Sequence, residues 1–220
     1  MNTGKQIGFR FGWDSPEALS EHEYIEPRIS QLVLSSASSG ALTILDVGCG
    51  NGYIASRLAE NGHQVIGLDI SEDGIEIARK AYPHIRFEVL SAYDDLKEVF
   101  DEVDLIVSSE VIEHLYSPKI YLQNCYSVLR PGGVFILTTP YHGYLKNLTL
   151  SVFNMWDRHL NVDWDGGHIK FFSQKTLVAM LVKTGFRKAS FHNVGRIPFL
   201  WKSMVCRVEK PGLPETKVLL

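Results

Sequence analysis

The chain has 220 residues, of which 45% are hydrophobic and 21% are charged, and its formal net charge is −3. These values fit one α/β domain with a sizeable core, and they exclude a disordered chain and a strongly basic nucleic-acid binder. The three cysteines are far apart, and the opening residues lack an apolar signal core, so we expect a soluble cytoplasmic protein.

The elements predicted in chain order begin with a helix. Ser15-Pro16-Glu17 has the pattern of a capped helix start, so a helix is predicted from there to about Ser36. Short apolar strands then alternate with helices, with strands at 43–47, 64–68, 86–90, 104–108 and 134–139 and helices at 53–60, 71–81, 118–129 and 173–184. Residues 130–133 (RPGG) are expected to stop the helix before them, and 186–194 with 204–209 to form a strand pair at the sheet edge. This alternation indicates a parallel sheet that helices cover on both faces.

The segment from Tyr141 to Gly167 interrupts this alternation and is too long for an ordinary connection. It is rich in aromatic and histidine side chains, including Trp156, His159 and Trp164. Such loops usually close over a site. These side chains would either line a substrate pocket or pack the segment onto the sheet.

The most specific motif is Leu45–Gly52 (LDVGCGNG), which joins the first strand of the sheet to a helix. Glycines at such a junction allow a tight turn and close approach of a ligand. The spacing G-x-G-x-G differs from the dinucleotide fingerprint, which would need glycine where Tyr53 stands. Asp69 ends the next strand, where a carboxylate can accept both hydroxyls of a ribose. The alternative is that the glycines only make a turn and Asp69 only caps the next helix.

Four motifs in order resemble those of class I S-adenosylmethionine (SAM) methyltransferases: LDVGCGNG, GLDIS, DLIVSSEVIEHL and LRPGGVFILTTP. The resemblance implies a single Rossmann-like, doubly wound α/β sheet of seven strands. In this fold the last strand is antiparallel, helices lie on both faces, and here a lid insertion follows the fifth strand. It divides the chain into an N-terminal arm and capping helix (1–40), the methyltransferase domain (41–210, with the insertion at about 141–170) and a C-terminal tail (211–220).

SAM is the cofactor that this resemblance implies. Asp69 would bind the ribose, Gly48 and Gly50 would lie against the methionine part, and Ala92 and Tyr93 would flank the adenine. The full implied cofactor set is Asp46, Gly48, Cys49, Gly50, Asp69, Ile70, Ala92, Tyr93, Ser109 and Glu110. One departure concerns the adenine, because the acid that often follows the third strand is replaced by Ser91-Ala92-Tyr93, with Asp94 slightly later.

The segment EVIEHL places Glu110, Glu113 and His114 at positions i, i+3 and i+4, which share one face if the stretch is helical. Two carboxylates and an imidazole can hold a divalent cation. The E-x-x-E-H segment resembles that of the ubiquinone-biosynthesis O-methyltransferases. Small-RNA 2′-O-methyltransferases share it and add a downstream histidine, for which this chain offers His168. The resemblance therefore suggests a cation such as Mg²⁺ on Glu110, Glu113, His114 and His168. The alternative is a loop held by hydrogen bonds without any ion.

The predicted reaction is transfer of a methyl group from SAM to a small-molecule acceptor, with a hydroxyl as the leading acceptor. A phenol-like hydroxyl must lose its proton, and His114, His142 or His168 are the candidate bases. The alternatives are N-, C- or sugar methylation, an RNA 2′-hydroxyl, and a non-catalytic SAM-binding subunit. Nucleic acid is disfavoured, because the chain is acidic and has no appended RNA-binding module. The apolar run 195–208 (GRIPFLWKSMVCRV) indicates either weak peripheral membrane contact or an edge strand at a pocket or dimer surface, and no oligomeric state is predicted.

Overall fold

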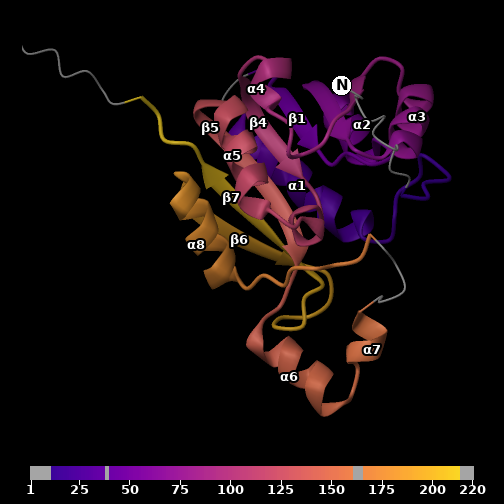
Figure 1. The fold of residues 1–220 in the computed structure, drawn as a ribbon, viewed down its shortest axis with the longest axis vertical. Coiled ribbons are helices and arrows are strands. Elements are labelled where there is room, and N and C mark those ends of the chain that lie inside the picture. The colour runs from indigo at the N-terminus through magenta and orange to yellow at the C-terminus, as the bar shows by residue number, and fades with distance from the viewer. Residues whose placement is uncertain (1–10, 38–39, 161–165, 214–220) are drawn as a thin grey trace, which may run out of the picture.

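A computed structural model describes residues 11–37, 40–160 and 166–213 of the chain. Its centre is one seven-stranded sheet in the order β3-β2-β1-β4-β5-β7-β6 (Figure 1). The strands are β1 (Thr43–Val47), β2 (Gln64–Asp69), β3 (Arg86–Val89), β4 (Val103–Ser108), β5 (Leu129–Pro140), β6 (Arg187–Val194) and β7 (Ser203–Glu209). β7 pairs antiparallel with both β5 and β6, and the other pairs are parallel. The predicted seven-stranded sheet with an antiparallel last strand is therefore confirmed.

Helices cover both faces of the sheet because the buried strands are apolar on both sides. Ile44 of β1 joins a core with α1 (His22–Ser36), α2 (Tyr53–Glu60) and α3 (Glu72–Ala81). The next residue, Leu45, faces the opposite core, with α4 (Leu96–Val99), α5 (Pro118–Val128) and α8 (Gln174–Thr184). The same alternation recurs at Leu105 and Ile106 of β4. Successive strand residues thus feed two separate cores, as a doubly wound sheet requires.

The first helix begins at His22, so the prediction of a start near Ser15 was wrong. Residues 15–17 are held outside the helix by bonds to the body of the protein. The Asn51 side-chain amide donates to the carbonyl oxygens of Ser15 and Glu17, both at 2.9 Å, and the Tyr82 hydroxyl donates to that of Pro16 at 3.1 Å. These long-range bonds use carbonyls that a helix would have needed for its own ladder. The helix buries Ile25, Ile29, Leu32 and Val33.

The boundary between α5 and β5 was predicted in part. The helix ends at Val128, before residues 130–133 as expected, but the strand begins at Leu129 and not at Val134, so it includes these residues. The pairing of β5 with β4 shifts register between Val103 and Leu105. Two backbone hydrogen bonds, from the Gly132 amide to the Lys210 carbonyl and from the Lys210 amide to the Gly133 carbonyl, extend the β5–β7 pairing beyond the end of β7. The four-residue helix α4, capped by the Asp95 side chain, was not predicted.

The insertion after β5 is not an irregular loop. It contains α6 (Tyr144–Val152) and α7 (Trp156–His159), which form a lobe below the carboxyl ends of β4 and β5 in Figure 1. Trp164 lies outside the described residues. Within the part of the chain that the structure describes, there is no helix with the length and apolar character needed to cross a membrane.

Candidate active site

The loop between β1 and α2 depends on its glycines. Gly48, Gly50 and Gly52 have φ values of 78°, 51° and 80°, a region that favours glycine. The amides of Gly48 and Cys49 both donate to the carbonyl of Leu68, at 2.7 and 3.0 Å. A methyl group on Gly48 would lie 2.3 Å from the Val111 side chain. The backbone at the carboxyl end of β1 is therefore held in a tight turn with no room for side chains.

Asp69 lies beside this loop, as the sequence predicts. Its Oδ2 accepts the amide of Gly50 and its Oδ1 accepts the amide of Ser71, each at 2.8 Å. Burial raises the pKa of Asp69, and these backbone hydrogen bonds oppose that shift. Asp46, nearly fully buried on β1, has a pKa raised to about 7 by burial and by the charge of Asp69. Two carboxyl groups thus lie together at the edge where a nucleoside would bind.

The other residues of the implied cofactor set follow the carboxyl ends of neighbouring strands. Ile70 comes after β2, Ala92 and Tyr93 after β3, and Ser109 after β4. Tyr93 is 38% exposed, and its hydroxyl accepts the amide of Ser117 at 3.1 Å. Cys49 is buried in the glycine loop, and all three cysteines of the chain are unpaired. The sheet topology brings these residues to one edge, and their contact with a cofactor stays a prediction.

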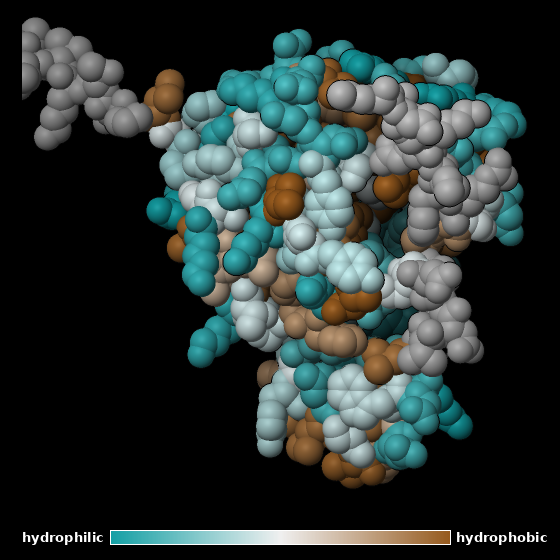
Figure 2. Space-filling view, viewed as in Figure 1, coloured by the Kyte–Doolittle hydropathy of each residue, from teal (hydrophilic) through white to brown (hydrophobic). Residues whose placement is uncertain are grey.

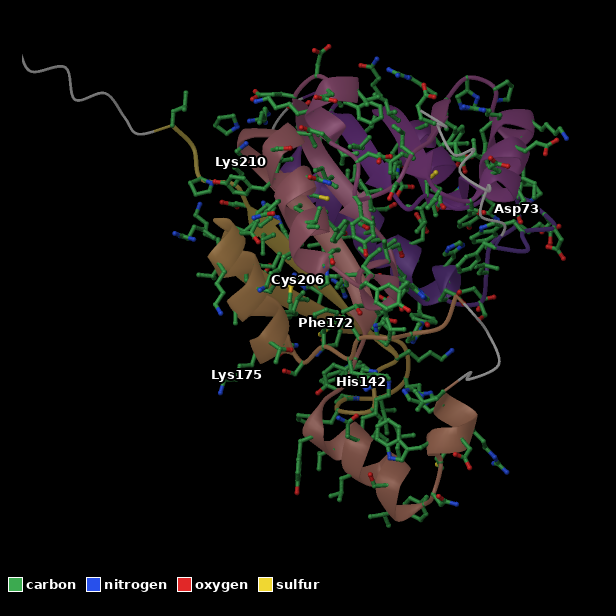
Figure 3. All side chains as sticks on the ribbon, viewed as in Figure 1. Asp73, His142, Phe172, Lys175, Cys206 and Lys210 are labelled. Carbon is green, nitrogen blue, oxygen red and sulfur yellow. The ribbon has the colours of Figure 1, made fainter. Side chains whose placement is uncertain are left out.

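Residues 11–13, which we term the aromatic strap, lie across the glycine loop. The amides of Phe11, Gly12 and Trp13 donate to the Asp73 carboxylate at 3.2, 2.8 and 3.0 Å. The Trp13 ring lies so close to Gly50 that a methyl there would be 2.4 Å from it, and the Phe11 ring lies 6.3 Å from the ring of His114. Figure 3 labels Asp73 on α3. The strap thus connects the glycine loop with the EVIEHL segment, a link that the sequence did not predict.

The EVIEHL segment does not form a helix with three ligands on one face. Only Ile112–His114 form a single 3-10 turn, and Glu110 precedes it with a left-handed φ of 53°. Glu110 contacts Thr138 of β5 instead. Its amide donates to the Thr138 hydroxyl at 3.0 Å, and its carboxylate accepts from that hydroxyl at 2.8 Å. The helical face that the spacing suggested is therefore not formed, although the Glu110 carboxyl group still acts on that of Glu113.

Glu113, His114 and His168 do come together, with ligand atoms within 4.8 Å of one another. The Glu113 Oε1 lies 4.0 Å from Nε2 of each histidine. Glu113 is fully buried, and neither carboxylate oxygen has a hydrogen-bond partner among the described residues. Burial and the nearby Glu110 raise the pKa of Glu113, and burial lowers those of both histidines, to about 4 for His168. An orphaned buried carboxyl beside two neutral imidazoles is a donor set that fits a divalent cation.

Backbone hydrogen bonds orient this cluster. The Nδ1 of His114 donates to the Gly166 carbonyl at 2.5 Å, which fixes the orientation of its ring. The amides of Ile169 and Lys170 donate to the Glu113 carbonyl at 2.9 and 3.0 Å, which holds the neighbouring His168 in place. The end of the insertion is thus fastened to the turn after β4.

His142 lies between the body and the lobe, where Figure 3 labels it. Its ring is buried against Phe171, with ring centres 4.9 Å apart, and His159, at 5.5 Å. Burial and the charge of Lys146 lower its pKa to about 4. Its Nδ1 faces the Asn147 side-chain oxygen at 3.3 Å, and because that oxygen only accepts, Nε2 carries the lone pair. His142 is therefore a buried histidine and not a solvated one. Figure 2 shows the lobe as a projection from the body of the molecule.

The comparisons with known proteins agree with the fold. Residues 20–190 match the family model described as "Methyltransferase domain". A "Ubiquinone biosynthesis O-methyltransferase" of Hydrogenovibrio crunogenus is 29% identical over 79% of this chain and 73% of its own length. A mitochondrial enzyme of that name from Rattus norvegicus is 33% identical over 66% of this chain and 44% of its own. The structure of magnesium protoporphyrin IX methyltransferase from Synechocystis, with bound SAH, superposes with a TM-score of 0.66 at 16% identity, covering 84% of this chain and 81% of that one.

Coverage of the relatives is uneven. A "Probable S-adenosylmethionine-dependent methyltransferase" of Mycolicibacterium smegmatis is 38% identical, over only 44% of this chain and 37% of its own length. The chain therefore spans between about a third and three quarters of the curated relatives described here.

Proposed function

Because the chain belongs to the methyltransferase domain family, we propose that it is a SAM-dependent enzyme that methylates a hydroxyl group of a small molecule. Its O-methyltransferase relatives support the reaction class. The observation that carries the choice of a hydroxyl acceptor is the cluster of Glu113, His114 and His168 beside the glycine loop. Phenolic oxygens are the acceptors that such a cation site and a nearby histidine base would activate.

The cofactor assignment rests on the edge formed by β1 and β2. Gly48 and Gly50 hold the loop in a left-handed turn beside Asp69, and each oxygen of the Asp69 carboxylate has a second lone pair for a ribose hydroxyl. Ala92 and Tyr93 would flank the base, and Ser109 and Glu110 would lie toward the methionine end. When bound, SAM supplies an activated methyl group on its sulfonium.

Three residues would hold a divalent cation: Glu113, His114 and His168. Glu110 is the fourth residue implied by the resemblance. Its carboxylate accepts a hydrogen bond from Thr138, and it is not among the three residues whose ligand atoms lie within 4.8 Å of one another. A bound cation would lower the pKa of an acceptor hydroxyl. Glu113 would supply the negative charge, and His114 is oriented for this role by its bond to the Gly166 carbonyl.

His142 is the base that we assign to the acceptor proton. It is neutral at pH 7, its Nδ1 proton points to Asn147, and its Nε2 is free to take a proton. The other two candidate bases, His114 and His168, would be engaged as ligands. Methyl transfer is an in-line displacement, so the remaining work of the chain is to align the acceptor oxygen and to exclude water.

The test is a transfer assay with methyl-labelled SAM and matched acceptors, catechol, aniline and thiophenol. We expect label in the catechol product, loss of activity after chelation, and recovery with Mg²⁺ or another divalent cation. His142→Gln should lower kcat by roughly 10²-fold or more, whereas His84→Gln, at an exposed site after α3, should match the wild type. Binding of SAH without any methyl transfer would refute the enzymatic proposal, and activity indifferent to chelation would refute the cation.

A further inference from the structure

Lys146 is a buried amine that the proposed chemistry does not use. It lies in the first turn of α6 and is only 5% exposed. Its Nζ donates to the Lys202 carbonyl at a long 3.4 Å. None of the ion pairs within 4.0 Å among the described residues includes it. An ammonium has three donors, and leaving two of them unmet in a buried position is costly.

Lys146 has one cationic neighbour, Arg196, and one acidic neighbour, Glu110. Burial and the nearby Arg196 guanidinium lower its pKa to about 8, and Glu110 opposes this shift. Glu110 is itself held by Thr138 and has a pKa raised to about 7 by burial. Lys202 places its Nζ over the Tyr24 ring at 4.7 Å. A buried ammonium with one long hydrogen bond and a guanidinium nearby would be stabilised by an anion.

The position of Lys146 identifies which anion this is. Its charge acts on His142 and His159, so it lies on the lobe side of the proposed base. No residue of the glycine loop is among the groups recorded around it in the described part of the chain. An acceptor beside His142 would meet Lys146 on this side. Glu110, which would lie toward the methionine end of the cofactor, is the acidic neighbour of Lys146, so the experiment below also tests the cofactor's own carboxylate.

We propose that Lys146, assisted by Arg196, binds an anionic group, a carboxylate or phosphate, carried by the methyl acceptor. This inference rests on the proposed function and adds the acceptor class, a hydroxylated organic acid. The anion would meet the free donors of the Lys146 ammonium and fix the distance from the acid group to the hydroxyl beside His142. Arg196 is an exposed residue of the loop between β6 and β7 with a left-handed φ of 64°, and its charge acts on Lys146.

The experiment compares 3,4-dihydroxybenzoate with the neutral 3,4-dihydroxybenzyl alcohol as acceptors. We expect the wild type to favour the acid, and Lys146→Met to reduce the ratio of the two kcat/KM values by roughly 10- to 100-fold, the effect of one charged hydrogen bond. Lys146→Arg should retain part of the preference, and Arg196→Gln should lose a smaller part. Lys175→Met, an exposed change on α8, is the matched control. An equal ratio in the wild type and Lys146→Met would overturn the proposal.

A binding measurement separates this proposal from the proposed function. With SAH bound, 3,4-dihydroxybenzoate should raise the Tm of the wild type and leave that of Lys146→Met unchanged. Methionine in place of an unpaired buried amine should fold at least as stably, so this variant stays informative. If neither compound is methylated but this Tm difference persists, the anion site stands and the hydroxyl chemistry fails. If Lys146→Met instead weakens SAH binding as much as acid binding, the anion is the cofactor's own carboxylate and the proposal is wrong.

Discussion

Asp73→Asn is the sharpest test of the aromatic strap. The Asp73 carboxylate accepts the amides of Phe11, Gly12 and Trp13 and the Ser71 hydroxyl. Burial alone would raise its pKa, but these hydrogen bonds lower it to about 2. An asparagine has one acceptor oxygen and turns an NH₂ group toward the same donors, so at least one of the hydrogen bonds from the strap amides must be lost.

The expected loss of stability follows from this pKa. A depression of this size corresponds to about 2 kcal/mol for a fully shielded group. Because the carboxylate is partly exposed, solvent screening reduces the expected loss to about 1 kcal/mol. The folded pKa lies below the unfolded one, so the contribution is complete above about pH 4. It should be lost as the pH falls toward 2.

The assay is urea unfolding of wild type and variant at pH 7 and pH 3, combined with hydrogen exchange at the amides of Phe11, Gly12 and Trp13. We expect faster exchange at these amides in Asp73→Asn and a difference in unfolding free energy that shrinks at pH 3. Glu72→Gln is the matched control, since it removes a carboxylate from the same helical turn without touching the strap. Unchanged exchange in Asp73→Asn, or an equal effect of Glu72→Gln, would refute the reasoning.

Three further changes test the site. Asp69→Asn should weaken SAH binding by roughly tenfold or more, measured by calorimetry, because a charged acceptor is lost; an unchanged affinity would assign Asp69 to the loop alone. Gly50→Ala should cost about 1–2 kcal/mol in unfolding experiments, because its φ is left-handed and its methyl would meet Trp13; wild-type stability would contradict the close approach of the strap. Glu113→Gln should raise the Tm of the metal-free protein, because an orphaned buried carboxyl is removed, and should abolish divalent-cation binding in a titration; retained binding would exclude Glu113 as a ligand.

Much of the sheet could be predicted because its signals are local. The apolar runs that became β1, β2 and β4 lie between helices whose starts carry turn or capping residues, such as Ser71 before α3. The start of the first helix, expected at Ser15, could not be predicted from local signals. Its apparent cap is overridden by bonds from Asn51 and Tyr82, which lie 34 to 66 residues further along the chain. Tertiary bonds of this range leave no trace in a local pattern.

For the site too, local patterns predicted some residue positions and not others. The carboxyl ends of parallel strands meet at one edge, so Gly50 and Asp69 could be placed together from their positions alone. The residue spacing of EVIEHL suggested a helical face, but Glu110 adopts a left-handed backbone and turns to Thr138. Lys146 carried no signal at all, since a single lysine in a sequence is normally a solvated surface residue.

The candidate cation site is divided between two parts of the molecule. Glu113 and His114 belong to the turn after β4, whereas His168 lies in the segment that follows the lobe. Two hydrogen bonds from backbone amides next to His168 to the Glu113 carbonyl hold this segment in place. A molecule that steadies the lobe would therefore also steady one of the three ligands. By thermodynamic linkage, if the acceptor increases the affinity for the cation by some factor, the cation increases the affinity for the acceptor by the same factor. Occupancy of the two would then rise and fall as one cooperative event.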